Sequence, residues 1–150
     1  MSQSDRRGPR RLFISANILL LIVAGLHTWG SLSQPTDPAD LELISAMKSR
    51  IVPVGLGWTP STFDIFRTLA LTMTISLVGM VVVNLGLLPL ARSLPGLLHR
   101  LSLLNAVVLA AIVVLSFVYR IAPPFLTLGI VDVLFLIVWL SARPAAAQAP

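Results

Sequence analysis

Apolar residues fill four long stretches of the chain, and polar or charged residues gather between and around them. None of the four stretches contains Lys or Arg, and Asp132 is the only acidic residue among them. A helix needs about 20 apolar residues to cross the hydrocarbon core of a bilayer, so each stretch is long enough to span a membrane. The stretches are Leu12–Thr36, Thr68–Ala91, Leu101–Tyr119 and Ile121–Ala142.

This pattern predicts an all-α membrane protein: an antiparallel four-transmembrane-helix bundle with a short amphipathic helix in the first outer loop. Short connections make consecutive spans antiparallel neighbours. We expect one transmembrane domain between two cytoplasmic tails, with an outer segment joining its first two spans. The tails cover residues 1–11 and 143–150, the domain 12–142, the spans about 12–32, 62–89, 101–120 and 124–142, and the outer segment 33–61.

The outer segment contains start and stop signals for two helices. Asp37 followed by Pro38 is typical of an N-cap with proline at the first helical position, and Pro53 is expected to stop the helix. Ser61 and Asp64 have the spacing of a capping box, which predicts that the second span begins before the membrane. The helix after Pro38 is expected to be amphipathic because apolar residues recur at helical spacing, namely Leu41, Ile44, Met47 and Ile51.

Two short turns are expected to connect the remaining spans. Ser93-Leu94-Pro95-Gly96 predicts a cytoplasmic turn into the third span, and Ala122-Pro123-Pro124 predicts an outer turn into the fourth.

Composition agrees with a membrane protein. The 150 residues are 56% hydrophobic and 11% charged, whereas soluble domains are about 45–50% apolar and about 25% charged. The chain has no cysteine, which excludes disulfides, thiolate metal sites and cysteine nucleophiles.

The net charge of +5 is explained by membrane topology rather than by a nucleic-acid partner. Basic residues in short loops stay on the cytoplasmic side, so the more basic side is predicted to be inside. We therefore expect a bacterial inner-membrane protein with both termini in the cytoplasm. Seven basic residues fall on that side: Arg6, Arg7, Arg10, Arg11, Arg92, Arg100 and Arg143.

A cleaved export signal is the alternative for the N-terminus. Arg10-Arg11 precedes an apolar run, and Ser31-Leu32-Ser33 resembles a small-x-small cleavage site. The uncharged run is longer than the usual apolar region of about 7–15 residues in such signals. We favour an uncleaved first span.

Polar residues within the spans are expected to face the interior of the bundle, because lipid cannot hydrogen-bond to them. In the second span this expectation applies to one stripe, formed by Thr68, Thr72, Ser76 and Gly79. In the fourth span Asp132, Leu136 and Trp139 fall on one face. Asn84 and Asn105 lie toward the inner side and are expected to pair with each other.

Asp132 is the most informative residue. A carboxylate at mid-bilayer costs at least about 2.5–3.5 kcal/mol on insertion scales, so it needs a partner or a role. It is either a proton acceptor or ligand counter-ion, or a protonated or paired group that holds helices together. His27, Asp132 and Arg120 are candidates to line one outward-facing polar cavity, which Trp58, Asp64 and Arg67 would cover. Arg120 has a simpler interpretation as a residue reaching the outer headgroups.

Several site types are excluded. The two histidines, His27 toward the outside and His99 in the predicted cytoplasmic loop, cannot jointly bind one haem. No metal-binding spacing and no nucleotide-binding glycine motif is present, so we expect neither metal nor cofactor. Small multidrug transporters also have four spans, but they depend on an acid in the first, which this chain lacks.

Three short motifs together resemble a family of small, uncharacterised bacterial four-span membrane proteins. They are Gly25-Leu26-His27, the outer segment with Met47, Pro53 and Gly55, and Thr62-Phe63-Asp64-Ile65-Phe66. The resemblance covers most of the chain and implies a four-helix inner-membrane protein with no catalytic assignment. It singles out His27 and Asp64. Members commonly have glycine after the aromatic pair, where this chain has Arg67-Thr68.

Two functions are compatible with the sequence. The leading hypothesis is a non-catalytic membrane protein that binds a lipid-like ligand or a membrane partner through the bundle and the outer segment. Its candidate binding residues are Trp58, Asp64, Arg67, Asn84 and Asn105. The alternative is a small membrane enzyme acting on a lipid or isoprenoid, with His27 and Asp132 as the acid/base pair and Arg120 as an anion anchor.

Overall fold

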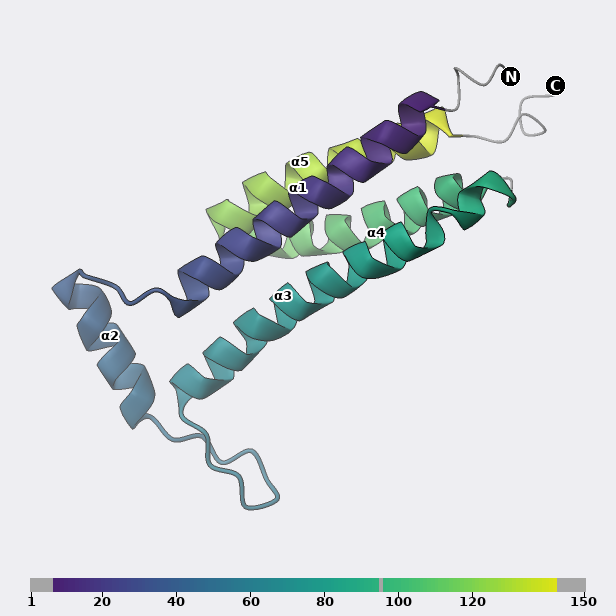
Figure 1. Ribbon diagram of the computed structural model, residues 1–150. Helices are drawn as coiled ribbons and strands as arrows, with labels where there is room; N and C mark the ends of the chain where they lie inside the picture. The colour runs from purple at the N-terminus through teal and green to yellow at the C-terminus, as the bar shows by residue number, and fades with distance from the viewer. Residues whose placement is uncertain (1–6, 95, 143–150) are drawn as a thin grey trace. The chain divides into compact units, whose positions relative to one another are not determined.

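The computed structural model describes residues 7–94 and 96–142 of the chain. Within these residues the protein forms five α-helices and one short 3₁₀ turn (Figure 1). The elements are α1 (Arg7–Leu32), α2 (Pro38–Ser49), α3 (Thr62–Leu87), η1 (Leu90–Arg92), α4 (Leu97–Val118) and α5 (Ala122–Ser141).

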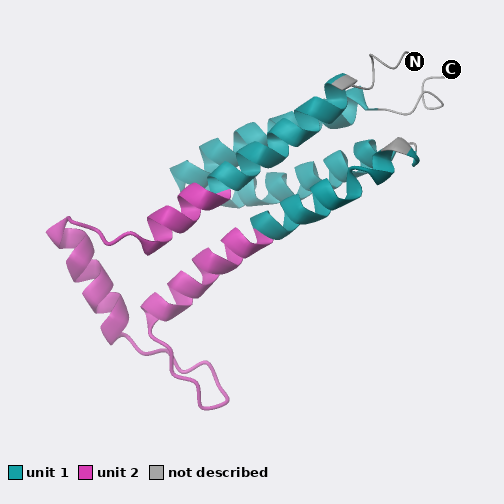
Figure 2. Ribbon diagram, in the orientation of Figure 1, with its two compact units in different colours: residues 1–23, 77–150 teal, residues 24–76 magenta. Residues whose placement is uncertain are grey.

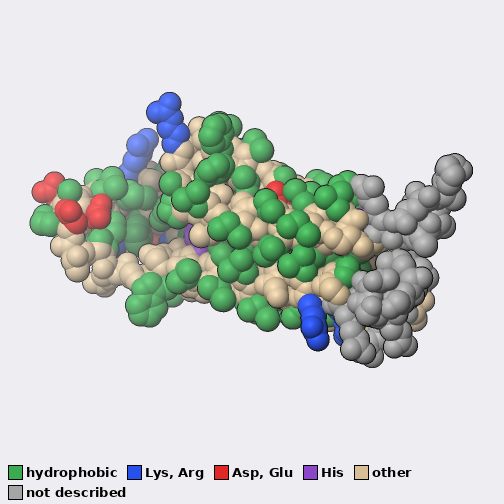
Figure 3. All heavy atoms as spheres, turned by 90° about the horizontal axis from the view of Figure 1, so that it is seen from above, with side chains coloured by type: hydrophobic (Ala, Val, Ile, Leu, Met, Phe, Trp, Pro, Cys, Tyr) green, Lys and Arg blue, Asp and Glu red, His purple; other side chains and the backbone are tan. Residues whose placement is uncertain are grey.

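The predicted all-α membrane fold is confirmed. Helices α1, α3, α4 and α5 are each long and apolar enough to cross a membrane, and α2 is the short helix expected between the first two. Hydrophobic side chains cover most of the face shown in Figure 3, where charged side chains form only small groups. Apolar surface of this extent suits lipid as the solvent, so the chain is a multi-pass membrane protein.

The helices differ from the expected spans at several ends. Helix α1 begins at Arg7, five residues before the expected start of the span. Pro9 does not prevent this, because the first turn of a helix has no intrahelical partner for its N–H groups. For the same reason Pro123 and Pro124 lie in the first turn of α5, so the prediction that they form the preceding turn was wrong. Tail residues 1–6 and 143–150, like Pro95 of the predicted turn, lie outside the described residues.

The structure divides into two compact units (Figure 2). The first contains residues 1–23 and 77–150, and the second contains residues 24–76, so α1 and α3 contribute to both.

In the first unit, α5 runs in the opposite direction to both α1 and α4. Phe13 near the start of α1 packs edge-on against Phe135 in the second half of α5, with 5.6 Å between ring centroids. The beginning of α4 likewise meets the end of α5, where the rings of His99 and Trp139 stack. The core contains large apolar side chains with no solvent exposure, among them Leu20, Leu109, Leu128, Val131 and Val138.

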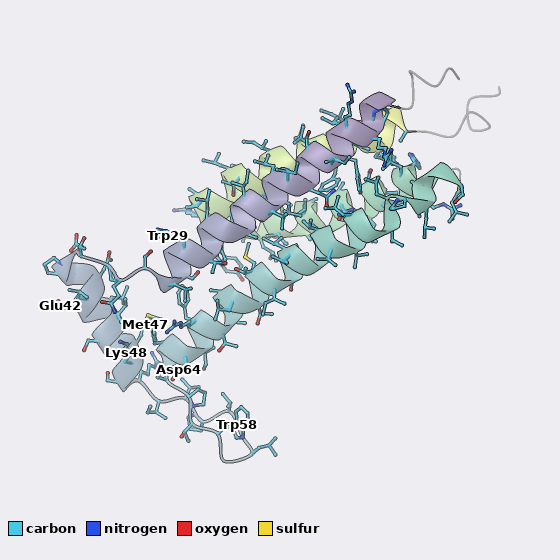
Figure 4. All side chains as sticks on the ribbon, viewed as in Figure 1. Trp29, Glu42, Met47, Lys48, Trp58 and Asp64 are labelled. Carbon is cyan, nitrogen blue, oxygen red and sulfur yellow. The ribbon has the colours of Figure 1, made fainter. Side chains whose placement is uncertain are left out.

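The second unit contains the end of α1, α2, the start of α3 and the loop between the two. The Thr28 hydroxyl on α1 donates to the Thr74 hydroxyl on α3 at 3.1 Å. The Lys48 ammonium on α2 lies 5.1 Å from the centre of the Phe63 ring on α3. Met47, Lys48 and Asp64 lie where α2 approaches the start of α3 (Figure 4).

Two predicted inward faces were wrong. On α3 the whole stripe of Thr68, Thr72, Ser76 and Gly79 is exposed, and the buried residues are Leu77, Val81 and Asn84. Thr72 and Ser76 donate to carbonyl oxygens four residues back at 2.8 Å, so their hydroxyls are satisfied without a second helix. On α5 the buried face is Leu128, Val131, Phe135 and Val138, whereas Leu136 is exposed and Asp132 and Trp139 are half-buried.

Candidate functional site

Three asparagines form a hydrogen-bonded network in the first unit. Asn84 on α3 donates through Nδ2 to Oδ1 of Asn17 on α1 at 2.8 Å and to Oδ1 of Asn105 on α4 at 3.0 Å. Asn105 donates back to Oδ1 of Asn84 at 2.9 Å. All three side chains are at most 2% exposed, so the network lies in the core.

The network uses nearly all of its hydrogen-bonding groups. Asn17 also donates to the carbonyl of Phe13 at 2.8 Å, and Asn105 donates to the carbonyl of Leu101 at 2.6 Å. Each of the three amide oxygens accepts a hydrogen bond, and both amide hydrogens of Asn84 and of Asn105 are donated. The expected pairing of Asn84 with Asn105 is confirmed, and the geometry gives both residues a role in joining helices. Their predicted role in ligand binding stays a prediction.

Asn17 is the member that sequence analysis did not connect to this pair. The residue type itself could have indicated the contact. A buried carboxamide has two N–H donors and an acceptor oxygen, and its own helix offers only carbonyl acceptors, so the oxygen needs a donor from elsewhere. An asparagine within a span therefore calls for a donor from another helix, which a serine or threonine does not.

His99 and Trp139 form a second polar contact. The indole Nε1–H of Trp139 donates to Nε2 of His99 at 3.0 Å, and Nδ1 of His99 lies 2.8 Å from the backbone carbonyl of Trp139. Since an indole only donates, Nε2 accepts and Nδ1 carries the hydrogen. That hydrogen satisfies one of the last carbonyls of α5, which lack intrahelical partners. His99 lies in the first turn of α4 rather than in the predicted loop.

Asp132 and His27 each have a buried polar atom without a partner. Oδ1 of Asp132 and Nε2 of His27 are inaccessible to solvent and form no hydrogen bond with the described part of the chain. Asp132 lies near the middle of α5 in the first unit, and His27 lies on α1 in the second. Buried polar atoms are normally hydrogen-bonded, so these two, together with Nε of Arg10, are the least explained polar atoms of the described residues.

Arg120 lies in a strained connection between α4 and α5. Its N–H donates to the carbonyl of Phe117 at 3.1 Å, and the next N–H, of Ile121, donates to Ser116 at 2.8 Å. These two bonds form a Schellman motif, whose C′ position requires a positive φ and favours glycine. Arg120 adopts φ +56° there, and its side chain is exposed.

Asp64 has a local structural role. Its Oδ2 accepts from the N–H of Ser61 at 3.0 Å and from the Ser61 hydroxyl at 2.6 Å. The N–H of Asp64 donates back to the Ser61 hydroxyl at 3.1 Å. This is the predicted capping box, and it starts α3 at the expected place. The predicted N-cap of α2 is also confirmed, because Asp37 accepts from the N–H of Ala39 at 2.8 Å.

The predicted polar cavity draws its residues from both units. Asp132 and Arg120 belong to the first, whereas His27, Trp58, Asp64 and Arg67 belong to the second. Trp58 and Arg67 are exposed. The cavity and its cover therefore stay predictions.

Within the described residues, no group of three His, Asp or Glu side chains is arranged to hold a metal ion. Comparisons with models of protein families, with curated proteins and with solved structures find no match for this chain.

Proposed function

We propose that this multi-pass membrane protein binds a lipid-like ligand or the span of a membrane partner, and that its outer segment forms the binding surface. One observation carries the proposal: the outer segment is ordered by its own hydrogen bonds, yet α2 buries none of its residues. An ordered helix that has no fully buried residue and exposes apolar side chains is suited to contact something else.

The order of α2 comes from both of its ends. Asp37 caps the first turn, and the N–H of Arg50 donates to the carbonyl of Ala46 at 3.2 Å at the other end. The carbonyl of Arg50 in turn accepts from the N–H of Thr62 at 2.8 Å, which ties the end of α2 to the start of α3. The segment is thus held in place by polar contacts, and its apolar side chains remain available.

The exposed apolar side chains of α2 indicate the chemistry of the ligand. Leu41 is 50% and Leu43 is 59% exposed, and Ile44 and Met47, which lie between them around the helix, are half-buried. Aliphatic side chains of this kind bind acyl or isoprenoid chains, or the apolar face of another helix.

The proposal includes an orientation. We place both termini in the cytoplasm and the outer segment on the opposite side of the bacterial inner membrane, because the loops on the terminal side hold the excess of arginine. The resemblance to the family of small bacterial four-span proteins supports the same location. The location in the inner membrane and the orientation are both parts of the proposal.

Photo-crosslinking from α2 tests the proposed binding surface. A benzophenone amino acid placed at Leu41 or Leu43 of the full-length protein in membranes is expected to give one defined lipid or protein adduct. Ile75, 71% exposed within α3, provides the control for contact with bulk lipid. If Leu41 and Leu43 give only the mixture of lipid adducts obtained at Ile75, the outer segment has no specific ligand and the proposal fails.

A second candidate function is acid/base catalysis on a lipid or isoprenoid, supported by the unpartnered buried atoms of His27 and Asp132. In this hypothesis the imidazole and the carboxyl exchange a proton with the substrate, and Arg120 attracts its anionic group. Asp132→Asn and His27→Gln keep the size of each side chain and remove its proton chemistry. Turnover of a lipid by the wild type that both variants lack, with their helical content unchanged, is the expected result. Retained turnover in either variant refutes it.

A further inference from the structure

The loop between α2 and α3 forms a narrow hairpin, defined here as residues 50–62 and called the outer hairpin. Its two arms are joined by hydrogen bonds from the N–H of Thr62 to Arg50 at 2.8 Å and from the N–H of Val52 to Pro60 at 2.9 Å. A third bond runs from the N–H of Val54 to Trp58 at 3.2 Å. These backbone bonds define the direction of each side chain along the arms.

The tip of the outer hairpin is a tight turn with an unusual residue. The N–H of Trp58 donates to the carbonyl of Gly55 at 3.0 Å, and the two residues between them, Leu56 and Gly57, have φ of +52° and +78°. Positive φ at both central positions is the pattern of a type I′ turn, which favours Asn, Asp or Gly at the first. A leucine is unfavourable in this conformation, and here its side chain is fully exposed.

The outer hairpin is apolar near its tip. The bridge there pairs Gly55 with Trp58, and the N–H of Val54 donates to the carbonyl of Trp58, so Val54 and Trp58 lie next to each other near the tip. Trp58 is 73% and Val54 is 55% exposed, and Figure 4 shows Trp58 on the loop that leads into the start of α3. Toward the base, Val52 and Pro60 are joined by a hydrogen bond and are half-buried, and no charged residue occurs from 51 to 63.

We propose that the outer hairpin docks on the membrane, with Leu56 and Trp58 inserted among the outer headgroups and upper acyl chains. The apolar side chains of the outer hairpin thus contact the same bilayer that α3 crosses. The outer hairpin continues directly into α3 at Thr62, where the carbonyl of Arg50 accepts from its N–H. The base of the hairpin is therefore fixed to the end of a membrane span.

Helix length places this base at the level of the headgroups. The 26 residues of α3 extend about 39 Å, which exceeds the hydrocarbon thickness of about 30 Å. Leu56 precedes Thr62 by six positions in the sequence, so the tip reaches about 20 Å from the base. A hairpin of this length, starting among headgroups, can insert its tip without leaving the interface.

The chemistry of the outer hairpin also fits a lipid surface. Tryptophan is enriched where membrane and water meet, because its ring is apolar and its N–H is polar. The cationic residues Lys48 and Arg50 lie at the base of the hairpin and not at its tip. At the base they are at the level of the lipid phosphate groups. Leucine in the strained turn is explained if its side chain is immersed in acyl chains.

This inference deepens the proposed function, because it assigns the bilayer surface to one part of the outer segment and leaves α2 for the ligand. The binding of a ligand by α2 and the insertion of the outer hairpin can be disproved independently. Crosslinks from Leu41 and Leu43 report on the ligand, whereas the experiment below reports only on the depth of the hairpin tip.

Because the chain contains no cysteine, a single label measures this depth directly. The full-length Leu56→Cys variant, carrying a bimane fluorophore, is reconstituted in vesicles of phosphatidylcholine and phosphatidylglycerol. Lipids with a nitroxide near the headgroup are expected to quench this label at least twofold more strongly than one at Glu42→Cys, an exposed position on α2. Aqueous iodide is expected to show the opposite order.

Two results overturn the proposal. The first is equal access of iodide to both labels. The second is protection at position 56 that disappears when the protein is diluted tenfold in lipid, which identifies a second copy as the occupant.

A conservative variant separates the apolar tip from the fold of the hairpin. Asparagine tolerates positive φ, so Leu56→Asn keeps the turn and removes its apolar side chain. With the label moved to Thr59→Cys, Leu56→Asn is expected to reduce quenching by nitroxide lipids at least twofold with helical content unchanged. Unchanged quenching shows that Leu56 does not hold the hairpin in the membrane, and the proposal fails.

Discussion

The carboxamide of Asn84 joins three helices because it donates to Asn17 and Asn105 and accepts from Asn105. Hydrogen bonds between membrane helices contribute about 0.6 kcal/mol each on average, although single values reach about 1.7 kcal/mol. Asn84→Leu fills a similar volume and removes three such bonds. We expect it to lower the free energy of unfolding by about 2 kcal/mol, measured by denaturant titration in mixed micelles.

Thr72→Val is the matched control for this variant. The Thr72 hydroxyl is exposed and donates only to Thr68 of its own helix. Its loss is expected to change the unfolding free energy by no more than about 0.5 kcal/mol. Equal effects of the two substitutions would show that the asparagine network does not stabilise the bundle.

Arg120 occupies a backbone conformation that opposes its side chain. A left-handed conformation costs a residue with a Cβ about 1–2 kcal/mol, and glycine avoids this cost. Arg120→Gly is therefore expected to raise the unfolding free energy by about 1 kcal/mol, and Arg120→Lys to leave it unchanged. If Arg120→Gly destabilises the protein, the arginine side chain contributes more to the fold than its exposed position indicates.

At the scale of single elements, the start of α3 depends on one reciprocal contact. The Ser61 hydroxyl accepts from the N–H of Asp64 and donates to its carboxylate. Ser61→Ala removes both bonds and is expected to cost about 1 kcal/mol. Hydrogen exchange of the first-turn amides of α3 measures this effect, and Ser61→Thr should restore protection. Exchange in Ser61→Ala at the wild-type rate would contradict a capping role.

Helix starts were predictable from sequence because capping is local. Asp37 and Ser61 each contact a residue within three positions of themselves, so their spacing alone carries the information. The start of α5 at its two prolines was less predictable. Pro123 and Pro124 are compatible with a turn and with a first helical turn, and only the preceding Schellman motif decides between them.

The inward faces were only partly predictable, because residue type alone does not specify which polar groups need another helix. The hydroxyls of Thr72 and Ser76 are satisfied by their own backbone and stay exposed on α3. The carboxamides of three asparagines are not satisfied by their own helix, and all three are buried: Asn17, Asn84 and Asn105. On α5 the large apolar side chains occupy the buried face and displace Asp132 to its edge.

At the scale of the whole molecule, sequence predicted the four spans and the outer helix because both follow from apolar length and spacing. Apart from the pairing of Asn84 with Asn105, it did not predict which side chains meet across elements. The contact of His99 with Trp139 joins residues 40 positions apart, and that of Asn17 with Asn84 joins residues 67 apart. Such pairs depend on helix rotation and depth, which no local pattern determines. The glycines at 55 and 57 predict the turn at Leu56, and the structure has it, but the positive φ of Leu56 itself was not predictable because leucine disfavours that conformation.

The central claim is that the chain crosses the membrane four times, with the outer segment on one side and both termini on the other. Single cysteines test it directly, since the chain contains none of its own. Thr36→Cys lies in the exposed connection between α1 and α2, and Ser93→Cys lies in the exposed connection between α3 and α4.

We expect a membrane-impermeant maleimide to label Thr36→Cys from outside intact cells and to label Ser93→Cys only after the inner membrane is permeabilised. Labelling of both cysteines from the same side, or of Ser93→Cys alone in intact cells, would contradict it.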